Sequence, residues 1–270
     1  KKNIDNMGFK THKFSKYIHK DQIRSINKMN FKDYSFKEII NYEINGIKVG
    51  QHAYSATLRY YGVGDLEAES NSKKILIKFL KASIISKTVF ENFFNKNKYD
   101  HILINSGLYV PQGILTEIAA KKGMFTTTWE FAYKKFSYFF SKNQTYHTAA
   151  FLEKNSNWEN LEMNQVIQNR IDNYLKSRWE GSQDRKIFIQ KPDYEISKFF
   201  ESNNFDQSKP IIGLATNLIW DAKVYYEDSF LDSVEWVDYT IKYFYKRTDL
   251  NLVIRIHPAE VLKDKPSRQR

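Results

Sequence analysis

A buried-looking strand near the end of the sequence stops on a histidine that is followed at once by a proline. The segment LNLVIRIHPAE spans residues 250–260, and its apolar run ends at His257. Pro258 cannot continue a strand ladder, but its fixed φ suits the first turn of a helix. The segment therefore predicts an imidazole beside a helix N-terminus, where backbone amides and the helix dipole attract phosphate. We assign His257, Pro258 and Glu260 to such a site; the simpler interpretation is a capping histidine that only closes the turn.

A second polar loop follows the preceding predicted strand. SKPIIGLATN, residues 208–217, is continuous and apolar before it ends in Thr216 and Asn217, and Asp221 lies four residues further on. Ligands of parallel α/β sheets bind beyond the carboxyl ends of the strands. If the two strands are parallel and adjacent, Asn217, Asp221 and His257 meet at one edge of the sheet. Arg255 is a further candidate phosphate contact, although it alternates to the opposite face of its strand.

Helices and strands that position these loops can be read from hydrophobic spacing and from turn residues. The spacing predicts two strand–helix–strand units of the parallel α/β kind. The first consists of a strand at 100–105, a helix that begins near Pro111 and ends near Gly123, and a strand at 124–130. In the second, a crossover helix at 230–248 joins the strands at 208–217 and 250–256. Two further helices are expected, at 73–97 and at 157–181. We expect an N-terminal domain over 1–190, including a helical bridge, and a C-terminal domain that begins at 205.

The composition is that of a globular, basic chain without cysteine. Of 270 residues, 41% are hydrophobic, and the formal net charge is +11. This charge favours an anionic partner such as a nucleotide, an acidic glycan or an anionic membrane surface. Alternatively, the scattered lysines reflect an AT-rich genome. Without cysteine, disulfides and thiolate metal sites are excluded, as expected in a reducing cytoplasm. No run of residues predicts a membrane span or a signal peptide.

Four segments of the sequence indicate a family: ATNLIWDA, the Glu-Trp helix, LVIRIHPAE and the SRQ at 267–269. In these segments the sequence resembles bacterial capsule and surface-polysaccharide biosynthesis proteins. These are glycosyltransferases of the two-domain GT-B type, similar to the Kdo transferases of capsule assembly. The resemblance is strongest over 209–269 and looser over the segment that ends in MFTTTWE. It implies two Rossmann-like parallel-sheet domains with a nucleotide-sugar donor, such as a CMP- or UDP-sugar, bound between them. The C-terminal, donor-side domain is expected to be truncated and to bind sugar nucleotides poorly, because the sequence ends shortly after His257.

The resemblance also implies roles for individual residues. His257 contacts the donor phosphate and stabilises the leaving group, with Asn217, Asp221 and the HPAE turn around it. A carboxylate of the N-terminal domain then serves as the general base for a glycan or lipid-linked glycan acceptor. Glu130, at a strand end, is the first candidate, although an ordinary surface carboxylate would have the same sequence context. Asp65 and Glu67 follow it. His52 is a candidate for the acceptor side, or a packed histidine.

The sequence contains fewer features that would indicate other functions. There is no Asp-x-Asp pair, HExxH motif, GxSxG elbow or P-loop, so we expect neither a metal nor a cofactor. A nucleotide-sugar epimerase on the same fold stays open as an alternative. A basic nucleic-acid-binding module is the other alternative, but no basic stripe with interleaved aromatics stands out, and nucleic acid is not expected as a partner. The expected location is the cytoplasm, with peripheral contact at the inner membrane.

Overall fold

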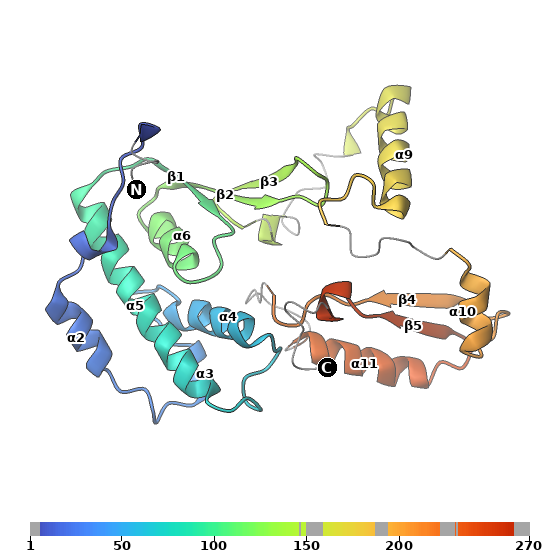
Figure 1. Cartoon of the computed structure of the whole chain (residues 1–270), viewed down its shortest axis with the longest axis horizontal. Coiled ribbons are helices and arrows are strands. Elements are labelled where there is room, and N and C mark those ends of the chain that lie inside the picture. Colours follow the sequence, from blue (N-terminus) through green and yellow to red (C-terminus); the bar gives the residue numbers. More distant parts are fainter. Residues whose placement is uncertain are drawn as a thin grey trace. The chain divides into compact units, whose positions relative to one another are not determined.

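A computed structural model describes residues 6–145, 147–149, 159–186, 194–221, 230 and 232–261. The fold is mixed α/β, with a three-stranded mixed sheet and a two-stranded parallel sheet (Figure 1). Contacts divide the chain into two compact units. Unit 1 comprises 1–60, 66–130 and 139–152, and unit 2 comprises 61–65, 131–138 and 153–270. The domain boundary expected between 190 and 205 lies partly outside the described residues and stays a prediction.

Unit 1 is built around one long helix, α5 (Ser72–Lys96), which matches the helix predicted over 73–97. Its inward side chains recur every three or four residues, and Leu76 and Leu80 are completely buried. The Ser72 hydroxyl donates a hydrogen bond of 2.7 Å to the Leu66 carbonyl and fixes the start of the helix. α5 packs against α2 (Lys20–Lys28), α3 (Phe36–Ile40) and α6 (Gln112–Lys121). A short 3₁₀ turn, η1 (Phe14–Lys16), precedes α2, and α4 (Val49–Tyr61) precedes α5.

The sheet of unit 1 confirms the first predicted strand–helix–strand unit. β1 (His101–Asn105) and β2 (Phe125–Phe131) are parallel, with His101 opposite Phe125 and Asn105 opposite Trp129. α6 connects them; Pro111 is its N-cap residue, and Gly123 follows its end with a positive φ of 70°. β3 (Tyr138–Lys142) completes the order β1-β2-β3.

Unit 2 contains the second predicted unit. β4 (Ile211–Ala215) and β5 (Asn251–Arg255) pair in parallel, and α11 (Ser233–Tyr245) is the crossover helix between them. α11 runs alongside the two strands, and the 3₁₀ turn η2 (Pro258–Val261) follows β5 (Figure 1). Asp232 caps α11 by accepting hydrogen bonds of 2.8 Å from the amides of Val234 and Glu235. Two helices come earlier in this unit: α9 (Gln165–Glu180) and α10 (Ile196–Ser202). α9 ends at Gly181 as predicted, but it begins at Gln165 and not at the predicted residue 157.

Two expectations about burial in unit 2 are wrong. A continuous apolar run such as 208–217 is typical of parallel strands buried on both faces, but Ile211 and Ile212 are each 40% exposed. An apolar run gives a strand its backbone shape, whereas its burial requires layers on both sides. The spacing of 230–248 also predicts an apolar stripe of Leu231, Val234, Val237, Ile241 and Phe244, but Val234 and Ile241 are 43% and 47% exposed. Val237 and Phe244 of this stripe are half-buried, together with Trp236 and Thr240, and Leu231 lies outside the described residues.

A histidine bridge joins α4, α6 and the loop after β1. The Nδ1 atom of His52 lies 2.5 Å from the Leu108 carbonyl oxygen, and Nε2 lies 2.8 Å from Oε1 of Glu117. The other carboxylate oxygen of Glu117 accepts the Lys48 amide at 2.8 Å. Gly113, in the first turn of α6, lies directly against the imidazole. The absence of a side chain at Gly113 thus lets α6 approach α4 closely enough for the bridge to form.

We expect Gly113→Ala to destabilise unit 1 by about 2–4 kcal/mol, the range of severe overpacking. An added Cβ would lie 2.2 Å from Nδ1 of His52 and 2.5 Å from the Leu108 carbonyl oxygen. The free energy of unfolding in urea measures this effect. Gly213→Ala in β4 is the control, because a Cβ there meets nothing within 4 Å. Equal stability of the two variants would contradict the close approach of α6 to His52.

Candidate functional site

The two polar loops predicted to meet do lie together at the carboxyl edge of the β4–β5 pair. Ala215 is opposite Arg255 in the parallel register, so the two strands end side by side. Beyond them, the Thr216 amide donates to the Arg255 carbonyl at 3.0 Å, and the Thr216 hydroxyl accepts the His257 amide at 2.9 Å. The adjacency of the loop after β4 and the HPAE turn is therefore confirmed.

A second bond across the loops involves Glu260. The residue is 7% exposed, and its Oε1 atom accepts the amide of Ile219 at 3.1 Å. Trp220 and Ala259 are buried beside this contact. Glu260, predicted as a donor-binding residue, therefore holds the two loops against each other in this structure. A buried carboxylate that accepts an amide is a costly group to replace by an apolar one.

The HPAE turn differs from the expected helix start with free amides. η2 is a short 3₁₀ turn in which the Ala259 amide donates to Nδ1 of His257 at 3.1 Å. The Glu260 amide donates to the His257 carbonyl at 2.9 Å, and Pro258 has no amide hydrogen. His257 thus caps its own turn, as in the simpler interpretation. The first two amides of the turn are therefore engaged: the Ala259 amide by the His257 ring and the Glu260 amide by the His257 carbonyl.

This contact determines the chemistry of the His257 ring. Nδ1 accepts a hydrogen bond, so the neutral ring carries its proton on Nε2. Burial lowers the pKa of His257 below its usual value of 6.5; the carboxylates of Glu260 and Asp221 act in the opposite direction, and Lys186 adds to the lowering. Near neutral pH, His257 is therefore an uncharged hydrogen-bond donor and does not carry a positive charge.

The other predicted donor-side residues lie around this pair of loops. Asn217 turns its side chain back onto the chain, and its Oδ1 atom accepts the Leu218 amide at 2.8 Å. Asp221 is half-buried and close enough to His257 to influence its pKa. Arg255, the last residue of β5, is exposed. Thr216 matters more than its place in the sequence suggested, because one hydroxyl group connects the ends of both strands.

The predicted acceptor-side residues lie at separate places in the chain. Glu130 is half-buried near the end of β2, beside a turn in which Ser106 and Gly107 adopt positive φ. Asp65 and Glu67 belong to the turn between α4 and α5, on either side of the buried Leu66. Both ring nitrogens of His52 face acceptors in the bridge described above. Glu117, its partner, was not singled out from the sequence, where its spacing from His52 carries no signal.

No family model, curated protein or solved structure matches this chain. Within the described ranges, none of the helices combines the length and apolar content needed to cross a bilayer. Nor do three or more His, Asp or Glu side chains gather in the described part in a way that would hold a metal ion. The functional argument therefore depends on the geometry of the two loops.

The lowered pKa of His257 predicts a pH dependence for the β4–β5 region. An unfolded chain binds a proton at His257 as the pH falls through about 6.5, before the folded chain does. Stability is thus fully present above that pH and is lost as the pH falls toward the lower, folded pKa. His257→Gln should abolish this part of the pH dependence. Hydrogen–deuterium exchange of peptides from β4 and β5, corrected for intrinsic rates, measures it between about pH 7.5 and 5.5.

The comparison of wild type with His257→Gln isolates this residue, because both proteins keep the other histidines. Identical pH dependence in the two proteins would show that His257 does not titrate differently on folding.

Proposed function

We propose that this chain is a glycosyltransferase of the GT-B type that transfers a sugar from a nucleotide-sugar donor to a surface glycan. The observation that carries the proposal is the pair of cross-linked loops, 216–221 and 257–261, at the carboxyl edge of the parallel β4–β5 sheet. This edge is where parallel α/β sheets bind nucleotides and other ligands. The resemblance of 209–269 to capsule biosynthesis enzymes supports the same assignment.

In the proposed reaction, the bond between the anomeric carbon of the sugar and the donor phosphate breaks. The acceptor oxygen forms the new bond to that carbon, its proton passes to a carboxylate, and negative charge develops on the departing nucleotide. His257 donates its Nε2 hydrogen to this phosphate, and Asn217 and Asp221 line the same edge. A neutral donor of this kind gains strength as charge develops in the transition state. No metal takes part in this scheme.

The acceptor side of the proposal rests on unit 1 and on the turn between α4 and α5. Glu130 is the first candidate for the general base, since it is the penultimate residue of β2, at the carboxyl end of the parallel β1–β2 pair. Asp65 and Glu67 are the next candidates. His52 contributes indirectly, by holding the loop after β1 through the Leu108 carbonyl. The acceptor is a glycan or a lipid-linked glycan.

We expect His257→Ala to lower turnover by roughly 10²-fold, the usual effect of removing one acid or electrostatic group. The assay follows labelled CMP-, UDP- and GDP-sugars and identifies the products. Sugar transfer supports the proposal; isomerisation of the donor would favour an epimerase, and binding of nucleic acid without turnover would favour a basic binding module. His19→Gln, at the exposed start of α2, is the control and should retain wild-type turnover.

A decrease limited to His257→Ala, with folding intact by circular dichroism, would support the role of the imidazole. Unchanged turnover in the folded variant would contradict it, because the proposed phosphate contact would then contribute nothing.

Contact with an anionic membrane is the second part of the proposal, and the turn between β2 and β3 is the surface best suited to it. At this turn Phe136 is 98% exposed, and Tyr133 is 67% exposed. Lys134 and Lys135 lie between them. Loop residues after α9 brace the turn: the Lys135 amide donates to the Gln183 carbonyl at 2.9 Å, and the Arg185 amide donates to the Tyr133 carbonyl at 2.8 Å. Aromatic side chains beside cations suit the headgroup region of an anionic bilayer.

We expect Phe136→Asn to weaken binding to vesicles of phosphatidylcholine and phosphatidylserine roughly threefold to tenfold, because one aromatic side chain no longer inserts into the bilayer. Asparagine tolerates the positive φ of 58° at this position, so the turn should persist. Tyr245→Asn is the control, because Tyr245 is 87% exposed at the end of α11. Vesicle co-sedimentation measures both variants. Equal binding by wild type and Phe136→Asn, or equal binding to purely zwitterionic vesicles, would contradict the proposal.

A further inference from the structure

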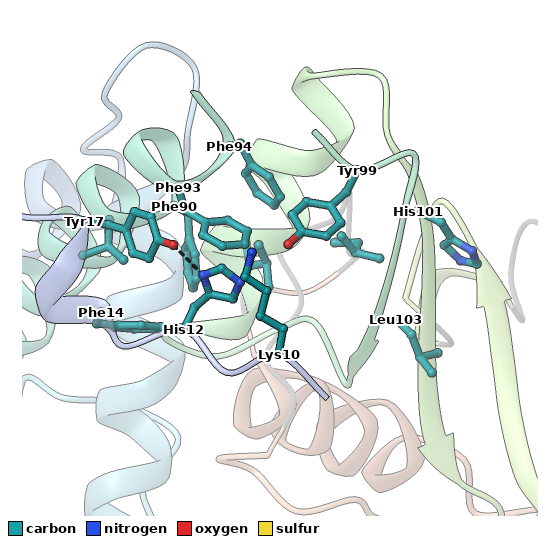
Figure 2. Close-up of a pocket in the computed structure, with 13 residues that line it drawn as sticks. Lys10, His12, Phe14, Tyr17, Phe90, Phe93, Phe94, Tyr99, His101 and Leu103 are labelled. Carbon is teal, nitrogen blue, oxygen red and sulfur yellow. Dashed lines mark hydrogen bonds between the residues drawn. The ribbon is translucent and has the colours of Figure 1, made fainter. Parts of the chain in front are cut away.

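Unit 1 contains a pocket of about 370 Å³ that is separate from the residues discussed above. It lies among the N-terminal segment, the C-terminal half of α5 and the start of β1 (Figure 2). Its volume falls within the range of about 300–1,000 Å³ that is usual for small-molecule sites. Because Tyr99 and His101 line it, it lies at the amino end of β1. Glu130 belongs to the opposite, carboxyl end of the parallel β1–β2 pair.

Aromatic rings in fixed relative orientations form most of the wall. Phe93 is the central ring: it stacks on Tyr99 at a centroid distance of 5.5 Å and an interplanar angle of 13°, and Tyr17 meets it edge-on at 5.1 Å. Phe14 meets Phe90 in the same edge-on way at 5.3 Å. These contacts among the rings hold the wall in place without a ligand. A ring or another flat apolar body finds both ring faces and ring edges to pack against.

One polar atom in the pocket has no partner. The Nδ1 atom of His12 lies 2.5 Å from the Tyr17 hydroxyl oxygen, while Nε2 is buried and makes no hydrogen bond within the described part of the protein. When the hydroxyl donates to Nδ1, the neutral ring carries its hydrogen on Nε2 and presents a buried donor. A buried donor without an acceptor costs free energy, which a ligand oxygen would recover.

Among the described residues that line the pocket with His12, those that can be charged near neutral pH are all basic. Lys10 lines the pocket, is exposed and forms no ion pair with any described residue. His101 also lines it, and none of the described lining residues is Asp or Glu. In Figure 2 Lys10 and His12 border the pocket from the same N-terminal segment. The unpartnered nitrogen and the lysine together favour an anionic group at this side of the pocket.

We propose that this pocket binds a small amphipathic anion. The ring-bearing apolar body of the ligand packs against Phe93, Phe90 and Tyr99. The carboxylate or phosphate oxygen of the ligand accepts the Nε2 hydrogen of His12, on the same side of the pocket as Lys10. The inference does not depend on the proposed glycosyl transfer, since none of the pocket residues belongs to the donor loops or to the candidate bases. It assigns unit 1 a ligand site of its own.

A matched pair of ligands tests the proposal: 2-naphthoate, and 2-naphthylmethanol, which has the same ring system without the charge. Isothermal titration calorimetry should show saturable one-to-one binding of 2-naphthoate that is about tenfold tighter than that of the alcohol, as expected for a hydrogen bond to a charged group. His12→Phe keeps a ring in place and should remove most of this preference. Lys10→Met should weaken binding of the anion and leave binding of the alcohol unchanged.

Lys16→Met is the control, since Lys16 is exposed in η1 and does not line the pocket. It should bind 2-naphthoate as the wild type does. Should His12→Phe fail to fold, Lys10→Met still decides the question, because Lys10 is exposed and its replacement leaves the core intact. Equal affinity for the two ligands, or equal weakening by Lys10→Met and Lys16→Met, would overturn the proposal. So would the absence of saturable binding of 2-naphthoate.

Discussion

The bridge made by His52 is the interaction on which the geometry of unit 1 around the end of β1 depends. Its two ring nitrogens face the Leu108 carbonyl and the Glu117 carboxylate, so one side chain of α4 holds both the loop after β1 and the helix that follows it. A carbonyl oxygen only accepts, so Nδ1 carries a hydrogen. Nε2 lies 2.8 Å from Oε1 of Glu117. These two contacts hold α4 to the loop after β1 and to α6, and Gly113 supplies the space that the imidazole needs.

The hydrogen bonds at the edge of β4 and β5 perform a comparable function in unit 2, where little apolar burial is available. Ile211 and Ile212 are 40% exposed, and no residue of α11 (233–245) is buried. The Thr216 hydroxyl and the Glu260 carboxylate nevertheless hold two loops in one arrangement. Directional bonds of this kind define a geometry even where the hydrophobic contribution to folding is small.

Sequence patterns predicted the regular elements well because those elements depend on local spacing and turn residues. Helix α5, the β1–α6–β2 unit and the parallel β4–β5 pair all follow from apolar periodicity together with Pro111, Gly123 and Gly181. Burial in unit 2 was predicted wrongly, since apolar character in a strand does not reveal what covers it. The partners of side chains were the least predictable feature. Glu117 is 65 residues from His52, and the aromatic pocket combines residues from positions 10 to 115, so no local pattern marks either one.

The two bonds between loops 216–221 and 257–261 have a consequence for recognition, because they couple the loops energetically. Glu260 comes from the turn after β5 but satisfies the amide of Ile219 in the loop after β4. A ligand that drew the carboxylate away would leave that amide without an acceptor, next to the buried Trp220. Conversely, a ligand oxygen that takes over the Ile219 amide releases Glu260 and, with it, a carboxylate near His257. Binding of a ligand to the loop after β4 thus changes the proton affinity of His257 after β5. Ligand binding and protonation at this edge are therefore linked thermodynamically.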